Sequence, residues 1–132
     1  MIVSPTRPPN YEAIAAAFPV VRSKRGIVYT YGHTIHNPDN IHVAADLHAH
    51  EEVHERQQAG IGPEGWWTAY ILGPEFRFAQ ELEAYRAQYR FSQENYPRDQ
   101  RRALLRHISK TLAGPMYGSL VSPDAARRMI TS

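Results

Sequence analysis

The chain contains no cysteine. This absence excludes disulfide bonds, thiolate metal sites and cysteine nucleophiles, so any transition metal must be held by histidine and carboxylate side chains. The sequence also lacks an apolar run near the roughly 20 residues that cross a bilayer, and residues 1–10 contain no apolar segment typical of a secretory signal. We therefore expect no membrane partner, and a location in the cytoplasm or within a virion.

An excess of charge of either sign is also lacking. The chain has 15 Lys and Arg against 13 Asp and Glu, which gives a formal net charge of +2. The basic residues are dispersed, with short clusters only at residues 22–25 and 98–106, and solvated helix faces explain such clusters more simply than a polyanionic partner does. Nucleic acid is therefore not the partner that the composition predicts.

The length of 132 residues is sufficient for one domain with a modest core. Near the start of the chain, Pro5, Pro8 and Pro9 remove helical hydrogen bonds, which predicts an extended, Pro-rich arm over residues 1–9. The remaining residues, 10–132, are expected to form a single domain. An arm of this kind suits docking onto a larger protein assembly.

Beyond the arm, the pattern of residues predicts an α+β fold that is compact and mostly helical. β-branched and aromatic residues indicate β-structure over residues 26–36, with a turn or bulge at Gly32. We expect this small sheet or hairpin to pack on the helix that follows it. Helices are predicted over residues 11–18 (capped by Asn10), 43–58 (ended by Gly60), 74–93, 98–113 and 123–130 (capped by Ser122), with a loop at residues 60–65.

The helix over residues 43–58 carries the sequence His50-Glu51-Glu52-Val53-His54, an HExxH motif. Residues four apart on a helix lie about 40° apart around its axis, so both imidazoles can reach one metal ion. Glu51 falls at the rim of that face, where a carboxylate can accept a proton from water without binding the ion. The simpler alternative is a pair of buried histidines that are hydrogen-bonded to the backbone or to carboxylates.

A zinc site needs a third protein ligand, and the helix over residues 74–93 offers Glu81 and Glu83. Glu81 shares its helical face with Phe78 and Tyr85, which form the expected buried stripe, whereas Glu83 falls on the solvated face. A carboxylate on an apolar stripe needs a cation, and this argument favours Glu81 as the ligand. A salt bridge between Glu81 and Arg77, one turn earlier, is the alternative.

The motif HEEVH at residues 50–54, followed by ELEAY at residues 81–85, resembles the gluzincin branch of the zincin metallopeptidases. The resemblance implies one Zn²⁺ held by His50, His54 and Glu81, with Glu51 as the general base. It also implies a zincin-like domain that hydrolyses peptide or amide bonds of a peptide or protein substrate. The family usually has Asp or Asn where this chain has Tyr85, whose hydroxyl could still be donated to a ligand carboxylate.

Residues 29–89 as a whole are similar to small HExxH proteins of bacteria, phages and prophages. In the zincin family the cleft is often bordered by an edge strand before the first motif helix, and residues 29–36 occupy that place in the sequence. The resemblance therefore implies that this segment lies beside the site.

Several side chains are candidates to support the ligands or to stabilise an oxyanion. His36 is one, because a strand residue near the site could donate a hydrogen bond to a tetrahedral intermediate; the alternative is a strand-edge residue that faces water. Tyr70, Tyr85 and Tyr117 are equally good donors on sequence grounds, and Arg77 is a further candidate.

Two functions of different classes remain open from the sequence. The first is a zinc metallopeptidase; the second is a non-catalytic structural or assembly protein on a zincin-like scaffold, for example a phage particle component. A scaffold would use His50, His54 and Glu81 but has no need of a glutamate at position 51. Glu51 therefore favours the enzyme.

Overall fold

Proline decides where most of the helical segments begin. In the computed structural model, which describes residues 1–132, Pro63 and Pro74 are the first residues of α3 and α4, where a missing backbone N–H costs nothing. The helices are α1 Tyr11–Ala17, α2 Ala45–Ile61, α3 Pro63–Leu72, α4 Pro74–Asn95, α5 Arg98–Leu112 and α6 Pro123–Thr131, with 3₁₀ turns η1 Pro19–Arg22 and η2 Pro115–Tyr117.

Three short strands complete the chain: β1 Ile2–Ser4, β2 Tyr29–Tyr31 and β3 Thr34–His36, in the sheet order β1-β3-β2. β2 and β3 are an antiparallel hairpin turned at Gly32, whose φ of +61° is the left-handed conformation that glycine tolerates. β1 pairs with β3 in parallel. The expected α+β fold, mostly helical with a small sheet, is confirmed.

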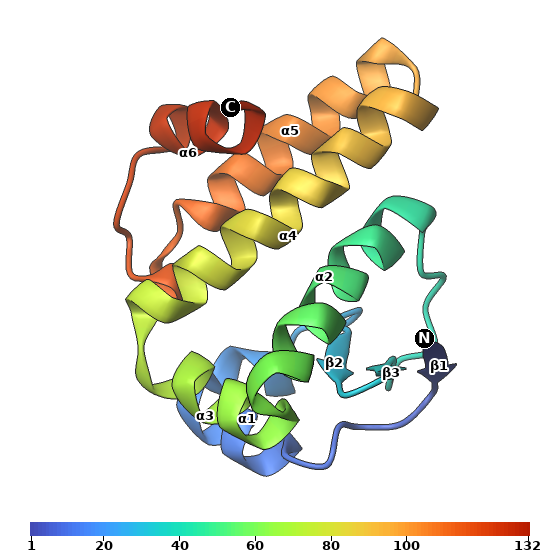
Figure 1. Cartoon of the computed structure of the whole chain (residues 1–132), viewed down its shortest axis with the longest axis vertical. Helices are drawn as coiled ribbons and strands as arrows, with labels where there is room; N and C mark the ends of the chain where they lie inside the picture. The colour runs from blue at the N-terminus through green and yellow to red at the C-terminus, as the bar shows by residue number, and fades with distance from the viewer.

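Residues 1–9 differ from a free arm because residues 2–4 belong to the sheet. Their backbone is tied at both ends: the Ile2 amide donates to the His33 carbonyl at 3.0 Å, and the Asn37 amide donates to the Ser4 carbonyl at 2.7 Å. Pro5 follows directly and ends the strand, since proline has no N–H for a ladder. The chain therefore starts at the edge of the sheet (Figure 1).

The sequence missed α3, and two other local predictions were wrong. α2 runs through Gly60 to Ile61 and ends before Gly62, whose positive φ of +83° is readily adopted only by glycine. Pro63 then starts α3 immediately, so residues 60–65 are mostly helical rather than a loop. Asn10 has φ −101° and ψ 23°, not the extended backbone of a capping residue, and its side chain caps nothing. Ser122 does cap α6, accepting from the Ala125 amide at 3.1 Å.

Helix α2 is the centre of the arrangement. It packs against β2 on one side and against α3 and α4 on others, while α4 also carries α5 and α6 (Figure 1). None of the helices combines the length and the hydropathy that a membrane span requires. The core is largely aromatic and aliphatic, and its most deeply buried large side chains include Ile14, Trp66, Ile108 and Leu112.

Candidate metal centre

The inward face of α2 carries three polar side chains where a core would ordinarily be apolar. His50, Glu51 and His54 are each at most 5% exposed. They point inward because α2 lies between β2 and α4, which cover its HExxH face. Buried imidazole and carboxylate groups are costly unless each polar atom has a partner.

The structure brings His50, His54 and Glu81 together. The two Nε2 atoms lie 3.2 Å apart, and each is 3.0 Å from Oε1 of Glu81. These separations leave a point about 2.0–2.1 Å from all three atoms, the usual length of a zinc bond to nitrogen or oxygen. Glu83, on the other face of α4, is exposed. We call His50, His54 and Glu81 the His/Glu centre.

The outer nitrogen of His50 is held by a chain of three side chains. Its Nδ1 lies 2.9 Å from Oε1 of Gln88, whose Nε2 donates to Asp46 at 2.8 Å, and the Tyr96 hydroxyl donates to the same carboxylate at 2.7 Å. Because Asp46 only accepts, the Gln88 amide must turn its oxygen to His50. The His50 Nδ1 therefore carries the proton, and Nε2 presents a lone pair to the centre.

The outer nitrogen of His54 is held in the same way by Gln57. Nδ1 lies 2.8 Å from Oε1 of Gln57, whose Nε2 donates to the Gln80 carbonyl at 3.0 Å and to Glu83 at 3.2 Å. Both of those partners are acceptors, so the amide oxygen must face His54. Glu83 thus supports the site from outside. Polar partners that orient the outer nitrogens are typical of histidines that bind metal.

Three acceptor atoms therefore converge on one point, and a cation is needed between them. Without a metal the cation is a proton: burial alone would lower the pKa of His54, but the charge and hydrogen bond of Glu81 outweigh it and raise the pKa to about 9. Burial likewise would raise the pKa of Glu81, yet His54 and His50 hold it well below its usual range. A divalent ion would satisfy the same atoms without the proton.

Glu51 lies beside this centre rather than in it. One carboxylate oxygen accepts from the Thr30 hydroxyl at 3.1 Å, and the other is 3.5 Å from the His50 Nε2. His50, Glu51 and His54 also form a group whose candidate ligand atoms lie within 4.8 Å of one another. Glu81 is the better third ligand, because its oxygen is 3.0 Å from both ring nitrogens. Burial raises the pKa of Glu51, against the opposing charge of the histidines.

Tyr70 holds the second oxygen of Glu81. Its hydroxyl donates to Oε2 at 2.6 Å, and the Tyr117 hydroxyl lies 3.5 Å from the same atom. Burial, reinforced by the Glu81 charge, raises the pKa of both phenols well above the usual value, so both keep their protons. Tyr85 does not donate to Glu81; its ring packs on His50 with centroids 4.7 Å apart. The supporting role considered for Tyr85 thus belongs to Tyr70.

Two of the predicted residues lie outside the centre. His36 bonds Thr6 through its Nδ1 at 3.0 Å and does not line the cavity at the site, because its neighbour Ile35 takes the buried face of β3 and side chains alternate along a strand. Arg77 makes no ion pair with Glu81. It donates instead to the backbone carbonyls of Tyr70, Ile71 and Met116, which fastens the end of α3 to α4 and η2.

A cavity of about 740 Å³ connects the His/Glu centre with the surface. Its inner end is lined by the centre together with Glu51, Tyr85 and Tyr117. Its outer end lies between residues 24–28 on one side and α5 with η2 on the other. The volume is in the range of pockets that take small molecules or short peptides.

The free edge of β2 is not available beside this cavity. The Thr30 carbonyl accepts hydrogen bonds from the Gln58 side chain at 2.8 Å and from the Trp67 indole at 2.9 Å, and the Gly32 amide donates to Gln58 at 2.7 Å. A peptide could not add to β2 as a further strand without displacing these groups. Trp66 and Trp67 are both buried, with Trp66 bonded to Gln80.

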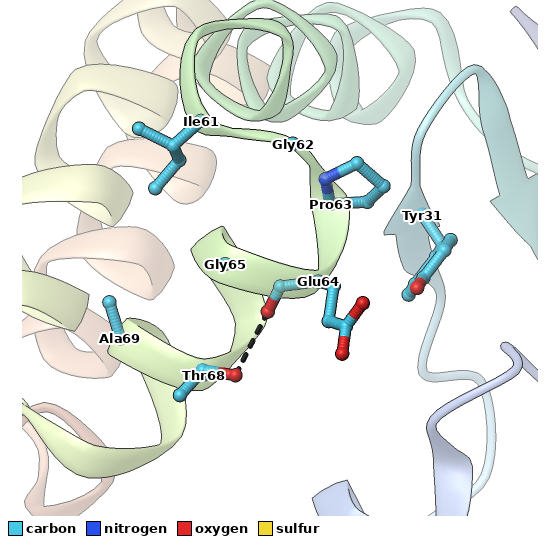
Figure 2. Close-up of a pocket in the computed structure, with 8 residues that line it drawn as sticks. All are labelled: Tyr31, Ile61, Gly62, Pro63, Glu64, Gly65, Thr68 and Ala69. Carbon is cyan, nitrogen blue, oxygen red and sulfur yellow. Dashed lines mark hydrogen bonds between the residues drawn. The ribbon is translucent and has the colours of Figure 1, made fainter.

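A second hollow, of about 730 Å³, lies where α2 joins α3 (Figure 2). It is lined by the turn at Gly62 and by Tyr31, Glu64 and Thr68 among others. The Thr68 hydroxyl donates to the Glu64 carbonyl within α3, and Glu64 is the only ionisable carboxylate there. No residue of the His/Glu centre lines this hollow, so the cavity at the centre is the candidate site.

The side chains that sequence reasoning missed are those that orient the centre: Asp46, Gln57, Gln88 and Tyr96. The arrangement as a whole can hold a divalent ion through two imidazoles and one carboxylate, with a fourth position open to the cavity and a buried carboxylate beside it. No protein-family model, curated protein or solved structure matches this chain.

Proposed function

We propose that the protein is a gluzincin-like, zinc-dependent hydrolase of peptide or amide bonds, in which His50, His54 and Glu81 hold one Zn²⁺. The observation that carries the proposal is the convergence of two Nε2 lone pairs and one carboxylate oxygen at 3.0–3.2 Å, with both Nδ1 atoms held from outside. Two nitrogens, one oxygen and no thiolate are a donor set that suits zinc. Three protein ligands with an open position are the catalytic pattern, whereas structural zinc sites usually have four.

The protein's own residues supply the acid–base part of the reaction. Zinc at this centre would act as a Lewis acid and lower the pKa of water at the open position. Glu51, 3.5 Å from His50 Nε2 and held by Thr30, would accept a proton from that water and pass it to the leaving nitrogen. Tyr85 and Tyr117 line the same cavity and keep their phenolic protons, so either can donate to the developing oxyanion.

A second candidate function is a non-catalytic structural or assembly protein, for example a phage particle component, in which zinc ties α2 to α4. One observation favours it: Gln58 and Trp67 occupy the edge of β2 where a peptide substrate would otherwise pair. The buried Glu51 argues the other way, because the zinc ligands do not need it for binding and its burial is costly.

Hydrolysis of a peptide library by wild type and by Glu51→Gln separates the two functions. Glu51→Gln keeps the shape and the Thr30 hydrogen bond but removes the base, so we expect zinc content to be retained and activity to fall by about 100-fold or more. Glu52→Gln is the matched control: its side chain is exposed and pairs with His48, so activity should be unchanged.

Full activity of Glu51→Gln would refute the mechanism. A wild-type protein that holds one equivalent of zinc but cleaves no peptide of the library would favour the structural candidate. Zinc content is measured by elemental analysis of the same samples, so loss of metal cannot be mistaken for loss of the base.

A further inference from the structure

The outer end of the cavity at the His/Glu centre is positively charged. Lys24 and Arg25 line one side of it, and Lys110 of α5 lines the other, with His107 one turn before Lys110. All four side chains are exposed, whereas the only acids that line the cavity are Glu51 and Glu81, which are buried at its inner end. The charge a ligand meets on entry is therefore cationic.

These cations are not neutralised by the protein. Lys24, Arg25 and Lys110 take part in no ion pair. Asp39, which contacts this segment, accepts from the Gly26 backbone amide at 2.7 Å. Arg22, in the same segment but outside the cavity, is paired with Glu12 at 2.8 Å.

Between the cationic opening and the centre the cavity walls are largely apolar. Ile27 and Val28 lie on one side, and Ile108 and Met116 on the other. A ligand that fits this sequence of surfaces has an anionic end, an apolar body and a scissile amide at the inner end. The volume of about 740 Å³ accommodates a short chain rather than a folded protein.

We propose that the cavity selects short peptides or acylated amino acids whose carboxylate is held by Lys24, Arg25 and Lys110 while the scissile amide lies at the His/Glu centre. This inference rests on the proposed hydrolase function and specifies its substrate class. The carboxylate has two possible sources, a C-terminus or an acidic side chain, and both present the same charge to the same three cations.

The test uses four peptides of one apolar sequence, with a C-terminal acid or amide combined with Glu or Gln near that end. Binding is measured by titration calorimetry on zinc-loaded Glu51→Gln, and hydrolysis is measured with wild type. We expect carboxylate-bearing peptides to bind about tenfold more tightly than the neutral peptide, with a preference that weakens in high salt. The comparison that shows the preference, acid against amide at the C-terminus or Glu against Gln, identifies the source of the carboxylate.

Charge reversal at the opening provides the structural control. Lys24→Glu and Lys110→Glu, made in the Glu51→Gln background, should abolish the preference. Arg106→Glu makes the same change one turn away on α5, outside the cavity, and should leave it intact. Equal binding of all four peptides, no binding of any, or an unchanged preference in Lys110→Glu would overturn the inference.

Failure of the proposed hydrolase function and failure of the carboxylate preference give different experimental results. Charge-dependent binding without hydrolysis of any peptide by wild type would refute the hydrolase but retain the anionic ligand. Hydrolysis that is the same for acidic and neutral peptides would retain the hydrolase and remove the carboxylate preference.

Discussion

At the scale of single residues, the two glutamates of α4 have opposite surroundings although they are two positions apart. Glu81 meets two imidazoles and the Tyr70 hydroxyl, whereas Glu83 is exposed and accepts only from Gln57. Helix periodicity alone predicts this difference, because residues two apart point to nearly opposite faces. Tyr70 was one of three equally good donors on sequence grounds, and it could not be chosen over Tyr85 and Tyr117 because it lies on α3, which the sequence did not indicate.

The same difference gives a prediction for zinc affinity. Glu81→Gln removes the only charged member of the proposed ligand set, so zinc affinity should fall by more than the 10- to 100-fold that is usual for loss of a supporting residue. Glu83→Gln keeps a hydrogen-bond acceptor for Gln57, and its affinity should stay within about threefold of wild type. Competition with a chromogenic chelator measures both, and equal losses in the two variants would reject Glu81 as the ligand.

At the scale of elements, the His/Glu centre joins α2 to α4, which are separated in sequence by all of α3. The HExxH spacing and the apolar stripe were enough to predict which faces of these two helices meet. The intervening α3 was missed because Gly65 and the aromatic run after it disfavour a helix locally. Tertiary packing stabilises the helix there instead, because Trp66, Trp67 and Tyr70 are all buried in the core.

Because the proposed zinc ligands come from two helices, zinc binding should stabilise the folded chain. Free zinc at about 100 times its Kd contributes about 2.7 kcal/mol, so a strong chelator should lower the melting temperature by about 10 °C. His50→Ala should abolish this response. His48→Ala, on the exposed side of α2, should keep it. Differential scanning calorimetry is the measurement, and an identical chelator effect in His50→Ala would place the metal elsewhere.

At the scale of the whole molecule, the stability of the metal-free chain should depend on pH through the centre. The folded pKa of His54 is raised from 6.5 to about 9, so its contribution is present below about pH 6.5 and is lost as the pH rises through about 9. The raised pKa of Glu51 changes stability in the same direction as that of His54. The pKa of Glu81 is lowered instead, so the stability that Glu81 contributes is present above about pH 4.5 and is lost in acid.

We therefore expect the metal-free protein to lose up to about 3 kcal/mol of unfolding free energy between pH 6.5 and 9. Its melting temperature should fall over the same interval. Zinc replaces the proton, so the zinc-loaded protein should not show this loss and the gap between the two should widen with pH. In Glu81→Gln the protonated His54 loses its charged partner, so the decrease of the melting temperature with pH should be smaller. A metal-free melting temperature that rises over this interval would contradict the assignment.

The sheet also has a consequence for how folded copies of the chain meet. An open strand edge is a template on which another chain can pair, and natural sheets commonly cover or shorten such edges. Here one edge is closed by Gln58 and Trp67 at the Thr30 carbonyl, and the other is β1, three residues long and stopped by Pro5. The fold thus offers no long unpaired ladder, which protects it against edge-to-edge association even though Ile2 and Val3 are exposed.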